Sequence, residues 1–136
     1  AWSWAEVTSD KKVSAWGTYC PGVVGEARDE AVDSANSQFF LMRQPYPSLD
    51  KRYTAFGRVL VGLDVVRAIK TGEPVEKPQD RMIKVRLLAD IPPAERPTVR
   101  VVDPARPWFK AEIARKRAAR GADFSVCDLD LAVDVR

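Results

Sequence analysis

The sequence contains no histidine and only two cysteines in 136 residues. Without histidine, this chain cannot form a Ser-His-Asp or Cys-His catalytic arrangement, and it cannot build a histidine-ligated metal site. Cys20 and Cys127 lie far apart and form no CxxC motif, so we expect neither a metal site nor a cofactor. We favour two small core cysteines, and the sequence leaves a disulfide between them open.

Long apolar runs and a strong charge bias are also missing. No stretch approaches the roughly 20 apolar residues of a membrane-spanning helix. The net charge is only +3, and basic and acidic residues are interspersed, so we expect no nucleic-acid partner and no membrane partner. The hydrophobic share of 46% and the charged share of 30% are typical of one globular domain with a real core.

Short strands and one helix are predicted for the first two thirds of the chain. Trp2 and Trp4 alternate with small residues before a polar turn, which predicts a hairpin over residues 1–20. Apolar residues at helical spacing predict a short helix over residues 63–69. Apolar or alternating runs predict four further strands, at residues 23–27, 37–42, 53–61 and 82–88.

The composition changes at Ile91-Pro92-Pro93, which predicts a linker or an extended crossover. We therefore divide the chain into residues 1–91 and residues 92–136. Strong helix formers with a proline before them and a glycine after them predict a basic helix over residues 108–120. Alternating patterns on either side of this helix predict two strands, at residues 98–102 and 128–135.

Five short blocks stand in a fixed order between residues 22 and 66. The most characteristic is Asn36-Ser37-Gln38-Phe39-Phe40-Leu41. It is preceded by Gly22–Arg28 and followed by Leu49-Asp50, by Tyr53–Val59 and then by Gly62–Val66. In order and spacing, these blocks resemble the C-terminal half of the cyclophilins, which are peptidyl-prolyl cis-trans isomerases, in their bacterial form.

The resemblance implies a mainly β fold, an antiparallel β-barrel with flanking helices and an outer groove that holds an Xaa-Pro segment. Phe39 and Leu41 would then face the barrel core. The helix over residues 63–69 would cover one end, and residues 83–88 would form the final barrel strand. Residues 1–91 would thus be a partial barrel that lacks its N-terminal portion.

By the same resemblance, six residues would line the substrate groove: Gln38, Phe40, Leu49, Tyr53, Ala27 and Arg28. Phe40 would form the floor of the proline pocket and Leu49 one wall, while Gln38 would hydrogen-bond the substrate backbone. Residues 27–28 would pair with the extended peptide through backbone groups. Tyr53 stands where other members often carry histidine. Taken one by one, these residues are equally typical of an ordinary core or surface.

Residues of these types suit prolyl isomerisation. Rotation about an amide bond meets a barrier of roughly 18–20 kcal/mol, and no nucleophile or metal is needed to lower it. An apolar seat for the proline ring, removal of water and a donor directed at the prolyl nitrogen favour the twisted transition state. In cyclophilins, an arginine supplies that donor.

Nothing in this chain matches the family's arginine motif, Phe-x-Arg-x-x-x-Gly-Phe-x-x-Gln-Gly-Gly, which would precede Gly22. We therefore identify no catalytic residue. We expect a fragment of a longer protein, because an open half-barrel would expose strand edges and core side chains. Two alternatives remain: a second chain supplies the missing half, or the protein is shortened and has no isomerase activity.

The segment 92–136 lies beyond a minimal cyclophilin. We expect its helix to pack across the barrel through Phe109 and Ile113, with Trp108 at the rim. A partner-docking role is the alternative, and its closing strand could cover an edge left open by the missing half.

Two functional hypotheses follow. The first is a peptidyl-prolyl cis-trans isomerase that acts on proline-containing protein substrates without a cofactor. The second is a non-catalytic cyclophilin-like module that binds extended, proline-containing peptides. The first residue is Ala1 rather than Met and no signal peptide is visible, so both the bacterial periplasm and the cytoplasm remain open.

Overall fold

The computed structural model describes residues 6–7, 13–129 and 132–136. Trp2, Trp4 and the polar turn of the predicted hairpin lie outside the described residues. No helix in the described part combines the length and the apolar character that crossing a membrane requires.

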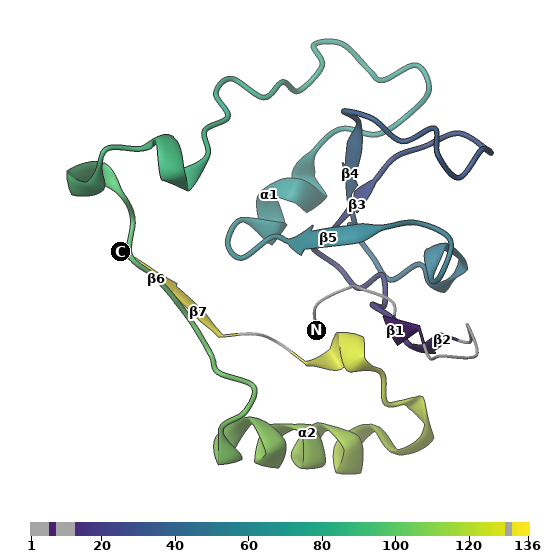
Figure 1. Ribbon diagram of the computed structural model, residues 1–136, viewed down its shortest axis with the longest axis vertical. Coiled ribbons are helices and arrows are strands. Elements are labelled where there is room, and N and C mark those ends of the chain that lie inside the picture. The colour runs from purple at the N-terminus through teal and green to yellow at the C-terminus, as the bar shows by residue number, and fades with distance from the viewer. Residues whose placement is uncertain (1–5, 8–12, 130–131) are drawn as a thin grey trace.

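Short antiparallel strands form the N-terminal part of the molecule (Figure 1). β1 (Glu6–Val7) and β2 (Val13–Ala15) pair with each other, which confirms the hairpin. A separate three-stranded sheet has β3 (Val23–Glu26) in the centre, flanked by β4 (Phe39–Leu41) and β5 (Ala55–Arg58). Both flanking strands run antiparallel to β3. The three predicted strands are thus confirmed, although each is shorter than predicted.

The two faces of the three-stranded sheet differ in burial. Along β3, Val23 and Gly25 are buried while their neighbours are half-buried, because successive residues of a strand face opposite sides. The core on the buried face consists of five residues: Tyr19, Cys20, Val23, Met42 and Ala55. On the other face, Phe39 is 46% exposed. The expectation that Phe39 is a core residue is therefore wrong for this chain, since no described segment covers that face fully.

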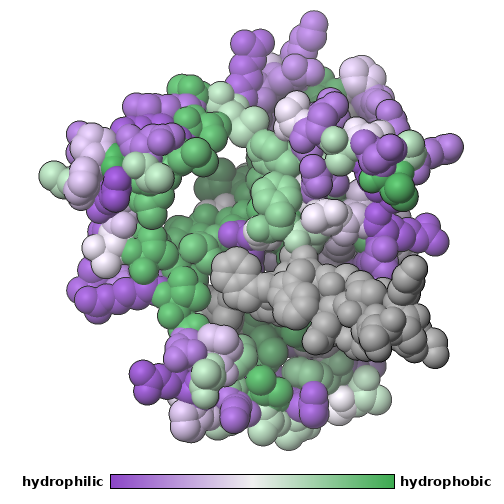
Figure 2. Space-filling view, viewed as in Figure 1, coloured by the Kyte–Doolittle hydropathy of each residue, from purple (hydrophilic) through white to green (hydrophobic). Residues whose placement is uncertain are grey.

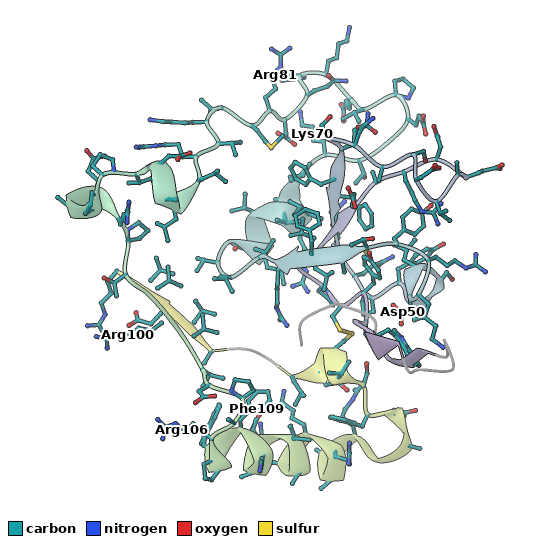
Figure 3. All side chains as sticks on the ribbon, in the orientation of Figure 1. Asp50, Lys70, Arg81, Arg100, Arg106 and Phe109 are labelled. Carbon is teal, nitrogen blue, oxygen red and sulfur yellow. A yellow bond between two sulfur atoms is a disulfide. The ribbon has the colours of Figure 1, made fainter. Side chains whose placement is uncertain are left out.

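The predicted helix after β5 is confirmed as α1 (Leu63–Ala68). It begins after Gly62, whose φ of 84° lies in the left-handed region that favours glycine. Beyond α1, Lys70 closes a loop (Figure 3). Its backbone N–H donates to the Asp80 carboxylate at 2.8 Å, and its ammonium group donates to the Pro78 carbonyl at 2.7 Å.

The strand predicted over residues 82–88 is wrong. This segment is extended coil that ends in a 3₁₀-helix at Leu88–Asp90. Its apolar side chains point into solvent, with Ile83 99% exposed and Val85 74% exposed. A strand needs a neighbour that accepts and donates its backbone hydrogen bonds, and no described strand pairs with this segment.

The C-terminal segment contains a two-stranded sheet and a helix. β6 (Val99–Val101) pairs antiparallel with β7 (Val133–Val135), and α2 (Pro107–Arg120) lies between them in the chain. α2 ends at Arg120 and is followed by Gly121, whose φ is 57°. The predicted helix and first strand are confirmed. The closing strand is shorter than 128–135, and it pairs with β6 rather than covering an edge of the three-stranded sheet.

The described strands form one three-stranded and two two-stranded sheets and do not close into a barrel. In Figure 1, α2 runs below the three-stranded sheet. Phe109 and Ile113 are half-buried, while Trp108 is 54% exposed. Packing of α2 across a barrel therefore stays a prediction. Four further 3₁₀-helices lie in the connections, at Pro47–Leu49, Pro93–Glu95, Gly121–Asp123 and Val126–Asp128.

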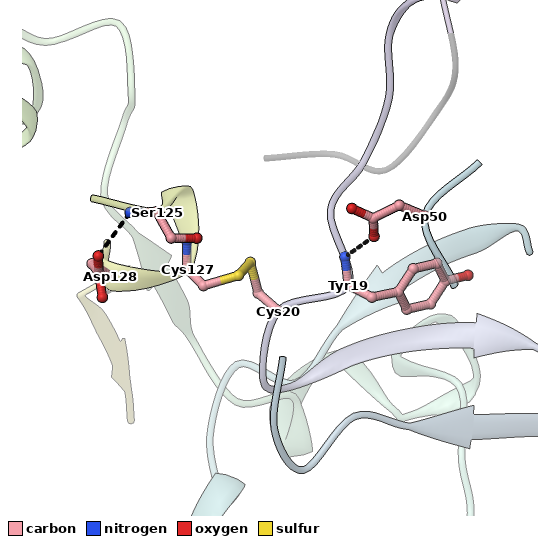
Figure 4. The surroundings of a disulfide bond; sticks show 6 residues. All are labelled: Tyr19, Cys20, Asp50, Ser125, Cys127 and Asp128. Atoms are coloured by element: carbon pink, nitrogen blue, oxygen red, sulfur yellow. Dashed lines mark hydrogen bonds between the residues drawn. A yellow bond between two sulfur atoms is a disulfide. The ribbon is translucent and has the colours of Figure 1, made fainter. Parts of the chain in front are cut away.

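A disulfide between Cys20 and Cys127 links the core of the sheet to the C-terminal segment (Figure 4). The favoured interpretation of two unlinked cysteines is therefore wrong. Ser125 and Asp128 brace the 3₁₀-helix that carries Cys127, because each side chain accepts a hydrogen bond from backbone within it. The Cα atoms of the two cysteines are 5.1 Å apart, a proximity that a sequence separation of 107 does not reveal.

Removing the disulfide should destabilise the chain strongly. A cross-link that closes a loop of this length restricts the unfolded chain, and its loss costs on the order of 4 to 5 kcal/mol. We expect the double variant Cys20→Ala/Cys127→Ala to lose about that much free energy of unfolding, measured by urea denaturation. Reductant should shift the denaturation midpoint of the wild type and leave that of the double variant unchanged. Equal midpoints for wild type and variant would contradict this assignment.

Candidate functional site

Three of the six predicted groove residues meet on the buried face of the sheet. Phe40, Leu49 and Tyr53 are half-buried, and all three pack against the core cluster. They come from β4, from the 3₁₀-helix after it and from the loop before β5, so the three-stranded sheet and its connections bring them together.

The Phe40 ring is confined from several sides. It stacks on Tyr19, with ring centroids 5.7 Å apart and an angle of 24° between the planes. Tyr53 meets it edge to face, with centroids 6.0 Å apart and an interplanar angle of 86°. On β3, a Cβ atom at Gly25 would overlap the Phe40 ring. Glycine is therefore required opposite Phe40 because the ring lies directly against the β3 backbone.

The loop that carries Leu49 is attached to the strand side through Tyr19. Asp50 follows Leu49, and its carboxylate accepts a hydrogen bond from the Tyr19 backbone N–H at 2.9 Å. At the other end of the same loop, the Tyr46 backbone N–H donates to the Tyr19 carbonyl at 3.1 Å. Both backbone polar groups of Tyr19, whose ring stacks on Phe40, thereby hold the loop that contains Leu49.

Gln38 and Ala27 lie next to each other, where β3 ends and β4 begins. The Ala27 backbone N–H donates to the Gln38 carbonyl at 3.0 Å, which continues the antiparallel pairing. The Gln38 side chain is exposed and Ala27 is half-buried. The side-chain amide of Gln38 is thus exposed, two residues before Phe40 in the chain.

Arg28 contacts the same group through Tyr53. Its guanidinium carbon lies 4.8 Å from the centroid of the Tyr53 ring, a cation–π geometry. The guanidinium also donates to the carbonyls of Asp29 at 2.7 Å, Glu30 at 3.0 Å and Arg52 at 2.7 Å. Arg28 therefore holds the turn after β3 against the loop before β5.

A hollow of about 570 Å³ opens elsewhere, lined by Lys77, Pro78, Gln79 and Arg81. It belongs to the connection after α1 and shares no residue with the Phe40 cluster. The aromatic cluster, rather than this hollow, coincides with the residues that the sequence singled out.

A model of the family described as "Cyclophilin type peptidyl-prolyl cis-trans isomerase/CLD" matches residues 5–88, more than half of the chain. The chain belongs to the cyclophilin family. All six predicted groove residues lie within the matched range. The cyclophilin-like barrel strand expected over residues 83–88 lies within it too, although it is coil in this chain.

The matches to known proteins cover only part of the length of those proteins. Probable peptidyl-prolyl cis-trans isomerases of Brucella abortus and Brucella suis are 44% identical over 73 residues, which cover 51% of this chain and 37% of each relative. The crystal structure of cyclophilin AquaCyp293 from Hirschia baltica superposes with a TM-score of 0.80 at 34% identity, covering 94% of this chain and 47% of that one. The chain thus spans about half or less of the cyclophilins that it matches.

The likeness to the Hirschia baltica cyclophilin supports a cyclophilin fold for this chain. It also reaches beyond the range of the family model. Only about eight residues of this chain lie outside the superposition, so most of the segment 92–136 is included in it.

Sequence reasoning missed Tyr19, which precedes the first cyclophilin block. Tyr19 is 1% exposed, and its hydroxyl has no hydrogen-bond partner among the described residues. Burial, and then the nearby charges of Asp50 and Tyr53, raise the pKa of Tyr19 to about 12. An aromatic residue two positions before Pro21-Gly22 is the only signal that the sequence offers, and it is a weak one.

The raised pKa of Tyr19 predicts a pH dependence of stability. Below about pH 10 the phenol is neutral in both the folded and the unfolded chain, so the stability from keeping it neutral is fully present. Between about pH 10 and 12 only the unfolded chain ionises this group, and stability falls. We expect denaturant titrations of Tyr19→Phe to show a smaller fall over this window than the wild type. Parallel curves would refute the assignment.

Proposed function

We propose that this chain supplies the proline-binding half of a peptidyl-prolyl cis-trans isomerase groove. One observation carries the proposal. Phe40, Leu49 and Tyr53 converge on one face of the sheet, inside the range that the cyclophilin family model matches. The Brucella relatives bear the name probable peptidyl-prolyl cis-trans isomerase, which supports the same reaction for the protein to which this chain belongs.

The proposed roles follow from the geometry. Phe40, wedged between Tyr19 and Tyr53, offers a flat apolar floor to a proline ring, and Leu49 offers a wall. Such a seat excludes water. The Xaa-Pro amide of a substrate whose proline ring lies in this seat then has no hydrogen bonds to water to lose when it twists. The exposed Gln38 side chain supplies polar contacts to the substrate backbone.

The donor to the prolyl nitrogen would come from outside this chain. Arg28 is a candidate because its guanidinium group contacts Tyr53. Three backbone carbonyls already hold this group in place, however. This arrangement suits a structural brace better than a group that must follow a twisting amide. We infer that the cyclophilin arginine lies in the half of the domain that this chain does not span.

The barrel would be completed by that other half, present either in a longer form of the protein or in a second chain. The described edges of β4 and β5 that face away from β3 pair with no described strand. In Figure 2, hydrophobic side chains also gather at the left of the molecule, beside a hollow. Among the exposed apolar residues, Ile83, Val85 and Leu87 belong to the coil segment after α1. Open edges and apolar side chains together are what additional strands would cover.

A non-catalytic peptide-binding module is the second candidate. It is favoured by the absence of the arginine motif from the sequence. Pairing of an extended peptide with backbone groups of residues 27–28, as the family resemblance predicts, would need no catalytic group.

The disulfide bears on the compartment. Disulfides persist in oxidising environments such as the bacterial periplasm, and they are rare in the cytoplasm. Because Cys20 and Cys127 are linked, we propose the periplasm over the cytoplasm.

An isomerisation assay on proline-containing peptides tests the proposed activity. We expect a longer form that includes the upstream half to be active and this chain alone to have little or no activity. Phe40→Ala in the active form should lower kcat/KM about ten- to a hundredfold, since burying a side chain of this size is worth roughly 1.5–3 kcal/mol. Trp108→Ala, at an exposed aromatic residue of α2, is the matched control. If the longer form did not accelerate isomerisation, the proposed enzymatic activity would be excluded.

A substitution at Phe39 tests whether the longer form closes the barrel over the exposed face of the sheet. In this chain Phe39 is 46% exposed, so Phe39→Ala should change the free energy of unfolding by only about 0.5 kcal/mol. In the longer form, where added strands would bury it, the same substitution should cost about 3–5 kcal/mol. Denaturant titration measures both values. An equally small loss in the two forms would argue against a barrel that closes over this face.

A further inference from the structure

We propose that Tyr19 is a positioning residue of the proline pocket, which fixes the Phe40 ring relative to the loop that carries Leu49. The inference rests on the proposed function, because it concerns the same pocket. Tyr19 would touch no substrate. It would act through the two groups that do, and its ring rather than its hydroxyl would carry this role.

The ring of Tyr19 supports Phe40 from below. It is the most deeply buried large side chain among the described residues, at 1% exposure, and it lies nearly parallel to Phe40. Offset stacking of this kind limits both the tilt and the displacement of the partner ring. Tyr53 and the Gly25 backbone confine Phe40 on other sides. Removal of the Tyr19 ring would therefore leave the face of Phe40 that now stacks on Tyr19 without support.

The backbone of Tyr19 fixes the opposite wall. Its N–H donates to Asp50 and its carbonyl accepts from the Tyr46 N–H, so the loop of residues 46–50 is hydrogen-bonded to it at both ends. Leu49 lies between these two attachments. Tyr19 therefore contacts Phe40 through its ring and holds the loop that contains Leu49 through its backbone.

The disulfide restrains this residue further. Cys20 directly follows Tyr19 and is linked to Cys127, which itself packs against the same core cluster. Figure 4 shows the cross-link and the hydrogen bond between Tyr19 and Asp50 on neighbouring residues of one segment. The C-terminal segment thus contributes a covalent anchor behind the pocket without lining it.

The hydroxyl of Tyr19 separates the role of the ring from that of the polar group. It is buried and unpartnered among the described residues, and an unpaired buried hydroxyl lowers stability. Phenylalanine at this position keeps the stacked ring and removes that cost. Leucine keeps an apolar side chain and removes the ring.

Kinetics of three variants in the active longer form test the proposal. We expect Tyr19→Leu to lower kcat/KM about tenfold or more, because small displacements of positioned groups are costly in rate. Tyr19→Phe should retain wild-type kcat/KM and be at least as stable. Val66→Ala, at a buried residue of α1 outside the core cluster, is the control for destabilisation by itself, and its kcat/KM should match the wild type at a temperature where all variants are folded.

Two results would overturn the positioning role. One is a Tyr19→Leu variant with wild-type kcat/KM, and the other is a Tyr19→Phe variant that loses as much as Tyr19→Leu. Proton NMR of this chain gives a readout that needs no activity: the ring-current shifts of the Phe40 protons should persist in Tyr19→Phe and collapse in Tyr19→Leu. Unchanged Phe40 shifts in Tyr19→Leu would contradict the stacking of Tyr19 on Phe40, even if the wild type proved inactive. Failure of the proposed function and failure of this inference are therefore distinguishable.

Discussion

The packing of the sheet's buried face against Tyr19 and Cys20 holds this chain together. Seven hydrophobic side chains are buried among the described residues, and five of them form one cluster on that face. A core of this size supplies little stability for 136 residues. The disulfide compensates because it joins the cluster to a segment that lies more than a hundred positions away in the chain.

The residues of the proposed pocket pack directly against the structural core. Phe40 and Tyr53 are half-buried, so each offers one surface to the core and one to solvent. A pocket floor needs both properties, since a ring that is held firmly from behind presents a fixed apolar surface in front. The exposed apolar face around Phe39 has the opposite character, because it lacks a covering layer in this chain.

The contrast between the two faces explains which sequence-based expectations failed. Residues 82–88 alternate as a strand does, and Phe39 occupies an inward position of the family pattern, yet both are exposed. Alternation specifies which side chains share a face, but a partner strand must be present for the ladder to form. Local signals were sufficient where the interactions are local, as in α1 and α2, whose apolar spacing and glycine boundaries gave nearly correct limits.

The sequence by itself determined the family, because cyclophilin blocks keep their order and spacing along the chain, and the same blocks predict which residues line the groove. Gln38, Phe40, Leu49 and Tyr53 could be named from that pattern alone. Only the tertiary structure decided that Cys20 and Cys127 are linked and that Tyr19 lies beneath Phe40. Both depend on contacts between segments distant in the chain, and the periodicity of neighbouring residues carries no information about such contacts.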